Sequence, residues 1–99
     1  MIDRHPSIVP ARPGEILRED VLPALAMSKA AVAQALGISR QTLYDILNEK
    51  QPVSAGMAVR LGKLFGNGAR FWIDLQRNHD LAVAERSVDV SRIPTLARV

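Results

Sequence analysis

The stretch ALGISRQTLYDILNEK, residues 35–50, decides how this chain folds. Its apolar residues recur at helical spacing, but Gly37 interrupts the run, and glycine readily takes the left-handed conformation that ends a helix. Ser39 follows two residues later, and a serine directly before an apolar helical run is a typical N-cap. The pattern predicts two short helices joined by a tight turn, with Arg40 and Gln41 opening the second helix.

Helical patterns continue on both sides of this stretch. Ser28 is a suitable N-cap for the helix that Gly37 ends, and Ser54 is a suitable N-cap for a later helix closed by Gly66 and Gly68. The later helix places Met57, Leu61, Leu64 and Phe65 on one face.

Two more helices complete the pattern. Pro13 fits the first turn of an opening helix that Pro23 ends or bends, and a last helix runs from about 69 to 86. We therefore expect an all-α fold of five helices.

The two ends of the chain lack this periodicity. Residues 1–12 hold two prolines and are interpreted as a flexible N-terminal arm. Residues 87–99 alternate briefly between apolar and polar types and contain Pro94, which indicates a flexible tail or an edge strand. The folded domain is accordingly expected over residues 13–86, with its helix–turn–helix core at 28–50.

The composition is that of a soluble globular chain. Its 99 residues suffice for one small domain, and the absence of cysteine excludes a disulfide framework and thiolate metal sites. No apolar run approaches the length of a membrane span and no signal peptide is visible, so a cytoplasmic protein is expected. The net charge is +3, and residues 28–63 carry five Lys or Arg against two acids. This excess suggests an anionic partner.

A helix–turn–helix exposes the first turn of its second helix while the apolar face is buried. That turn is Ser39-Arg40-Gln41-Thr42. A helix fits the major groove of DNA, where arginine can bind guanine and glutamine can bind adenine with two hydrogen bonds each. Free backbone N–H groups at the same helix end also suit a phosphate. Spacing alone leaves an alternative open, since Arg and Gln are common on solvated faces of helical bundles that bind no DNA.

The sequence resembles the lambda-repressor-like (Xre) helix-turn-helix family, and particularly its HigA/VapI-type antitoxins. The similarity covers about residues 12–86 and rests on PGEILRED at 13–20, LPALAMS at 22–28, SRQTLYDILN at 39–48, PVSAGMAVRLGKLFG at 52–66 and FWIDLQ at 71–76. The resemblance implies a dimeric five-helix protein that binds a palindromic operator at its own promoter. It further implies a type II toxin–antitoxin system, in which the protein neutralises a RelE-like (HigB-like) mRNA endonuclease toxin.

The resemblance also assigns roles to residues of the helix–turn–helix. Arg40 and Gln41 are expected to read bases, Thr42 and Tyr44 to lie near the DNA backbone or a thymine methyl, and Asp45 to orient contacts on the Arg40 side or accept from cytosine. For Asp45, a merely solvated acid is an equal alternative. The full set of expected DNA-binding residues, including the phosphate contacts, is Lys29, Ser39, Arg40, Gln41, Thr42, Tyr44, Asp45, Asn48 and Lys50.

Three positions depart from the family pattern. Lys29 stands where the family often has Gln, which removes a Gln–Gln brace between the two helices. Glu49 stands where Gly is common, and a carboxylate there is expected to repel phosphate mildly. Arg12 replaces the usual His of a His-Pro-Gly start.

Phe71, Trp72 and Ile73 are consecutive on the last helix and span about 200° of its surface, more than one core-facing stripe. We expect them to contribute a dimer interface, as two-fold operators require two copies. The alternatives are that the tail covers them or that the domain buries all three.

No catalytic or metal motif accompanies this pattern. The two histidines lie far apart in the chain, and acid clusters and glycine-rich phosphate loops are absent. We therefore expect no enzyme activity, no cofactor and no metal. The principal alternative function is a stand-alone Xre-family transcriptional regulator without a toxin; a purely protein-binding inhibitor and an RNA-binding protein fit less well. The sequence does not locate a toxin-binding surface.

Overall fold

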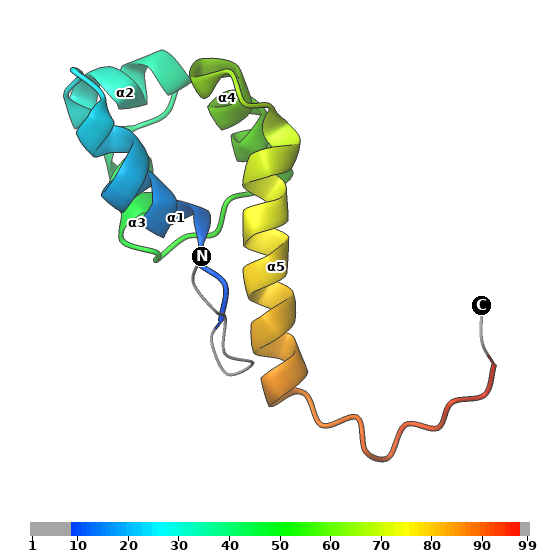
Figure 1. Ribbon diagram of the computed structural model, residues 1–99. Helices are drawn as coiled ribbons and strands as arrows, with labels where there is room; N and C mark the ends of the chain where they lie inside the picture. Colours follow the sequence, from blue (N-terminus) through cyan, green and yellow to red (C-terminus); the bar gives the residue numbers. More distant parts are fainter. Residues whose placement is uncertain (1–8, 98–99) are drawn as a thin grey trace.

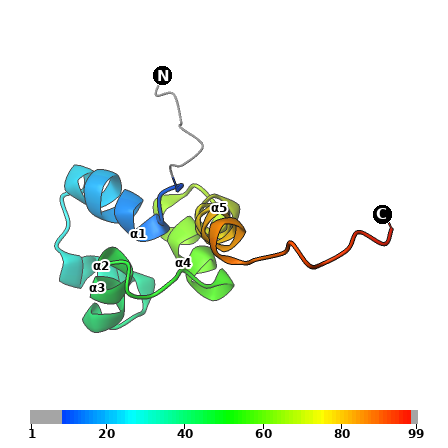
Figure 2. The same cartoon turned by 90° about the horizontal axis from the view of Figure 1, so that it is seen from below.

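The computed structural model describes residues 9–97, and over this part of the chain the secondary structure is entirely helical. Figures 1 and 2 show the shorter helices grouped together, with the long last helix extending from the group. The first segment consists of α1 (Pro13–Ile16), a π-helical turn η1 (Leu17–Val21) and a 3₁₀ turn η2 (Leu22–Ala24). It is followed by α2 (Lys29–Leu36), α3 (Arg40–Leu47), α4 (Ala55–Phe65) and α5 (Ala69–Ser87).

The helix boundaries confirm the signals in the sequence. The hydroxyls of Ser28, Ser39 and Ser54 each accept a hydrogen bond from a backbone N–H three residues later, at 3.1, 3.0 and 3.2 Å. Gly37 and Gly66 end α2 and α4 with φ of 73° and 74°, in the left-handed region that suits glycine.

The opening helix is less regular than a single helix bent by a proline. Only four residues are α-helical before the backbone widens into η1 and then tightens into η2. Pro23 has no N–H to donate, and the turn closes with a bond from the Leu25 N–H to the Leu22 carbonyl at 3.1 Å.

One apolar core unites all five helical segments. Its fully buried members come from each of them and from the loop before α4; they are Leu17, Val32, Ala33, Leu36, Leu43, Ile46, Leu47, Val53, Ala58, Leu61 and Trp72. Ile38, in the turn between α2 and α3, packs against this core as expected.

Two glycines allow backbones to meet inside this core. A Cβ on Gly14 would lie 2.0 Å from the carbonyl oxygen of Ile46, so α1 and α3 touch at a point where no side chain fits. A Cβ on Gly62 would lie 2.3 Å from the carbonyl carbon of Gly68, at the bend from α4 into α5. At both places the close approach requires glycine.

The start of α5 is anchored by its indole. Trp72 has no exposed surface, and its Nε1–H donates to the Asn67 side chain at 2.8 Å. One turn further, the buried Gln76 accepts from the Val53 N–H at 2.8 Å, which ties the loop before α4 to α5. These contacts set the direction in which α5 leaves the domain.

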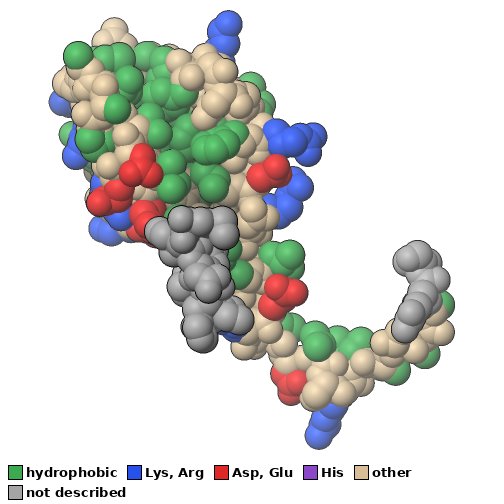
Figure 3. Space-filling view, viewed as in Figure 1, with side chains coloured by type: hydrophobic (Ala, Val, Ile, Leu, Met, Phe, Trp, Pro, Cys, Tyr) green, Lys and Arg blue, Asp and Glu red, His purple; other side chains and the backbone are tan. Residues whose placement is uncertain are grey.

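Beyond α5 the chain continues without a strand over residues 88–97, so the edge-strand alternative is not found in that segment. Figures 1 and 2 agree that the segment leads away from the helices. Its apolar side chains are exposed, and Figure 3 shows hydrophobic surface both along it and over the middle of the helical domain. Of the expected arm, residues 1–8 lie outside the described part of the chain.

We predict that Gly14→Ala lowers the free energy of unfolding by about 1–3 kcal/mol, because the added methyl group would overlap the Ile46 carbonyl. Urea unfolding followed by circular dichroism measures this. Gly56→Ala is the matched control, since its Cβ would meet nothing nearer than the Ser54 hydroxyl at 3.9 Å, and it should leave stability unchanged or raise it slightly. Equal unfolding midpoints for the two variants would show that the α1–α3 contact is not tight.

Candidate nucleic-acid interface

Burial on one side of α3 determines what the helix presents on the other. Leu43, Ile46 and Leu47 are at most 2% exposed, and they hold the helix against the core. Arg40 and Gln41 are exposed at its first turn. We call residues 39–42 the reading turn. The structure thus gives the reading turn the outward position that the sequence predicted, on a helix whose rotation is fixed by the core.

Ser39 organises the start of the reading turn. Its hydroxyl accepts from the Thr42 N–H at 3.0 Å and donates to the Thr42 hydroxyl at 2.9 Å. One of the free N–H groups at this helix end is therefore already satisfied, whereas the positive end of the helix dipole remains. Thr42 is half-buried, with its hydroxyl engaged by Ser39.

Gln41 and Asp45 are paired. The Gln41 Nε2–H donates to Asp45 Oδ1 at 2.8 Å, one helical turn apart. Asp45 therefore contacts Gln41 in this structure; its expected roles, to orient contacts on the Arg40 side or accept from cytosine, stay predictions. It is also not merely a solvated acid, because the side chain is half-buried and hydrogen-bonded.

Lys29 and Tyr44 link the two helices where the resemblance implied a missing brace. The Lys29 ammonium lies 5.9 Å from the centre of the Tyr44 ring, a cation–π contact at the outer limit of its range. Tyr44 is 38% exposed, so its ring is also available beside the reading turn. Lys29 remains exposed at the start of α2.

Asn48 and Lys50, which follow α3, are exposed as their expected role requires. Their backbone N–H groups are already committed, to the Tyr44 carbonyl at 2.9 Å and the Asp45 carbonyl at 2.8 Å. Any phosphate contact from these two residues must therefore use the side chains.

Glu49 adopts an unusual backbone conformation. Its φ is 60°, the only left-handed non-glycine conformation among the described residues, which accounts for the glycine that the resembling family often has there. Its carboxylate lies 3.2 Å from the Arg18 guanidinium of η1, which also pairs with Glu19. The expected mild repulsion of phosphate stays a prediction.

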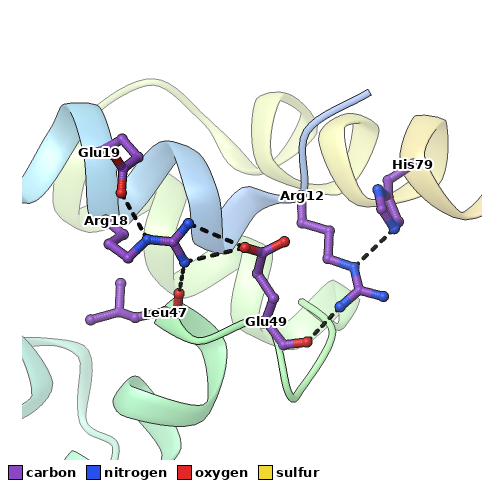
Figure 4. A network of polar contacts seen from close by, with 6 residues as sticks. All are labelled: Arg12, Arg18, Glu19, Leu47, Glu49 and His79. Atoms are coloured by element: carbon purple, nitrogen blue, oxygen red, sulfur yellow. Dashed lines mark hydrogen bonds and ion pairs between the residues drawn. The ribbon is translucent and has the colours of Figure 1, made fainter. Parts of the chain in front are cut away.

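Arg18 connects several groups at the end of α3 (Figure 4). It donates to the Leu47 carbonyl, the Glu49 carboxylate and, at 2.8 Å, the Glu19 carboxylate. The hydrogen bonds to Glu19 and then Glu49 raise the pKa of the Arg18 guanidinium above its ordinary value. Arginine stays charged at every ordinary pH, so Arg18 itself does not limit the pH range of these contacts.

Arg12 extends the network to α5. It donates to the Glu49 carbonyl and, at 2.9 Å, to His79 Nε2, while His79 Nδ1 lies 2.8 Å from the Pro10 carbonyl (Figure 4). A carbonyl only accepts, so Nδ1 carries the proton and Nε2 is the acceptor. Arg12, Arg18 and His79 were not identified as functional from the sequence. The only hint in the sequence was that Arg12 replaces a His that is usual in the family, and this hint indicated no partner for Arg12.

The three consecutive apolar residues of α5 have different environments. Trp72 has no exposed surface and packs edge-on against Phe71, with ring centroids 5.0 Å apart. Its expected place in a dimer interface is corrected, because a side chain enclosed within one protomer cannot reach another. Phe71 is 45% exposed and Ile73 is half-buried, so these two remain candidates for an interface.

The described residues contain no group of three or more His, Asp or Glu side chains placed to hold a metal ion. Within the same residues, no helix is long and apolar enough to cross a membrane. A cavity of about 720 Å³ beside α5 is lined mainly by apolar side chains, including Val53, Ile73 and Leu81.

The Arg18–Glu49 contact should be measurable in a double-mutant cycle. Alanine at both positions, singly and together, is expected to give a small favourable coupling energy that decreases with salt, since both side chains are about one-third exposed. Urea unfolding at low and high salt supplies the four stabilities. The Asp74–Arg77 pair is the control: at 3.8 Å and more exposed, it should show coupling near zero. Equal coupling in both pairs would mean that the Arg18 network adds nothing beyond a surface ion pair.

Comparison with known proteins gives a consistent family. The family model described as helix-turn-helix matches residues 17–72. Antitoxin GraA is 39% identical to this chain, covers 94% of it and 100% of its own length, and has a TM-score of 0.79. A second structure, GraA in complex with its operator, is 36% identical, covers 100% of this chain and 98% of its own length, and has the same TM-score. The Pseudomonas aeruginosa antitoxin HigA, solved with the higBA promoter, has 40% identity over 90% of this chain and 96% of its own, with a TM-score of 0.76. YddM of Escherichia coli, named as an HTH-type transcriptional regulator, is 36% identical over 86% of this chain and 89% of its own. This chain therefore belongs to the Xre-like helix-turn-helix family and shares the fold of the HigA and GraA antitoxins.

Proposed function

We propose that this protein is a sequence-specific DNA-binding antitoxin that represses its own operon. The observation that carries the DNA-binding half is the reading turn: exposed Arg40 and Gln41 at the start of a helix held by three buried side chains. Both are the side chains best suited to two-point contact with base edges. Exposed Lys29, Asn48 and Lys50 flank this turn and supply groups for phosphate.

The relatives support the same assignment. HigA was solved with its promoter and GraA with its operator, and both align with nearly the whole of this chain. Each of those proteins presents the same fold to DNA, so the reading turn of this chain is the corresponding candidate surface. Of the proposed contacts, Arg40 and Gln41 read bases, and Ser39, Thr42 and Tyr44 lie close to the DNA backbone or a thymine methyl.

Binding to a palindromic operator calls for two copies related by a two-fold axis, with half-sites about 34 Å apart. We propose a homodimer formed through α5, with Phe71 and Ile73, on either side of the enclosed Trp72, as the candidate contacts. The 45% exposure of Phe71, next to a fully enclosed Trp72, supports this choice.

DNA recognition is tested by titrating the protein against a duplex of its own promoter and a scrambled duplex, at two salt concentrations. We expect the promoter to bind more tightly, with affinity for both duplexes falling as salt rises. An Arg40→Ala/Gln41→Ala variant should lose the preference for the promoter, each lost contact costing about 1–3 kcal/mol.

A matched variant, Arg70→Ala/Arg77→Ala, removes exposed arginines from α5 and should keep the preference. If the wild-type protein binds both duplexes equally weakly, α3 serves only as scaffold and the function lies with a protein partner.

The antitoxin half of the proposal rests on the likeness to GraA and HigA, both named antitoxins. The proposed partner is a RelE-like mRNA endonuclease encoded beside this protein. The alternative is a stand-alone regulator, and the likeness to YddM, named only as a transcriptional regulator, favours it.

Co-expression separates the two. If the protein is an antitoxin, the product of the adjacent gene should arrest growth when expressed alone, and co-expression with this protein should restore growth and yield a co-purifying complex. An adjacent product without toxicity, or one that does not co-purify, favours the stand-alone regulator.

A further inference from the structure

We propose that Asp45 is a positioning residue that sharpens the selection of adenine over guanine by Gln41. This inference rests on the proposed DNA-binding function and names the base that Gln41 reads. Its basis is the hydrogen bond from Gln41 Nε2 to Asp45 Oδ1 at 2.8 Å.

The chemistry of the pair fixes the orientation of the Gln41 amide. A carboxylate carries no hydrogen-bond donor, so only the amide nitrogen, and not the amide oxygen, can face Asp45. Asp45 itself is half-buried on α3, whereas Gln41 is exposed at the helix start. The less mobile side chain therefore sets the position of the more mobile one, before any DNA is bound.

Occupying one donor changes what Gln41 can read. A free glutamine amide offers two N–H donors and one acceptor oxygen. With one N–H given to Asp45, a single donor and the acceptor remain for the groove. Adenine presents one acceptor and one donor there, N7 and the N6 amino group, whereas guanine presents two acceptors, N7 and O6. The paired Gln41 matches adenine and lacks the second donor that guanine needs.

Arg40, the residue before Gln41, has no such partner among the described residues. No side chain within residues 9–97 is hydrogen-bonded to its guanidinium, and a guanidinium has donors only. Arg40 thus suits guanine and the Asp45-bound Gln41 suits adenine. The pairing prevents two neighbouring side chains from competing for the same base.

The experiment selects duplexes from a library randomised over the operator half-site. Gln41→Ala first identifies the base pair that Gln41 reads, as the position where the preference disappears. The ratio of adenine to guanine affinity at that position is then measured for the wild type, Asp45→Ala, Asp45→Asn and the control Asp74→Asn. Asp74 is likewise an acid with a partner on its own helix, the Arg77 guanidinium at 3.8 Å, but it lies on α5.

We expect the wild type and Asp74→Asn to prefer adenine by about five- to a hundredfold. Asp45→Ala should lower the ratio severalfold at that position only, because the freed second N–H can serve guanine while the amide keeps its two-point match to adenine. Asp45→Asn should give an intermediate ratio, since its amide can bond Gln41 in either orientation. The ratio is unaffected by any general gain in affinity from removing a negative charge near DNA.

Three outcomes would overturn the inference. An unchanged ratio in Asp45→Ala shows that Gln41 does not depend on Asp45. A loss of preference at every position, in a variant whose thermal unfolding matches that of the wild type, shows that Asp45 has no specific effect on Gln41. If the wild type selects no sequence at all, the proposed DNA-binding function itself fails, and the inference fails with it.

Discussion

The burial of one face of α3 is the constraint on which the rest of the structure depends. Leu43, Ile46 and Leu47 turn the helix so that Arg40 and Gln41 must face outward, whether or not DNA is present. The core around them is built to keep that rotation. Gly14 allows the α1 backbone to rest directly on the Ile46 carbonyl, with no flexible side chain between the two helices.

The two ends of α3 are held by different means. At its N-terminus, Ser39 satisfies a backbone N–H through its own hydroxyl. At its C-terminus the carbonyl groups carry partial negative charge, and Arg18 and Arg12 donate to two of the carbonyls there, those of Leu47 and Glu49. Arg12 also bonds His79 of α5, so the end of α3, the start of the domain and the last helix are joined by one set of polar contacts.

Local signals in the sequence were sufficient for α2 to α5. Ser28, Ser39 and Ser54 act through atoms within three residues, and a glycine that ends a helix acts at its own backbone, so both can be recognised without knowing the fold. The irregular α1–η1–η2 segment was harder, because a π-helical turn has no comparable residue signature.

The other features that the sequence did not predict depend on contacts between residues far apart in the chain. Arg12 and His79 are 67 positions apart, and nothing local marks either as a partner of the other. Glu49 has a positive φ that its residue type does not suggest, and that conformation directs its carboxylate to Arg18. The sequence alone did not indicate which of the three consecutive apolar residues of α5 would be buried. Trp72 is the buried one, because it donates a hydrogen bond to Asn67 and packs against Phe65 of α4.

The contact between Gly62 and Gly68 fixes the angle between α4 and α5. This backbone contact at the α4–α5 bend is the pivot of any change in that angle, and the 19 residues of α5 extend about 28 Å from it. A rotation of only 10° at the pivot would displace the far end of α5 by about 5 Å, as the length of the helix requires. A methyl group at position 62 would press on the pivot and alter this angle. Two protomers joined through α5 would then hold their reading turns at a different separation, although neither reading turn had changed.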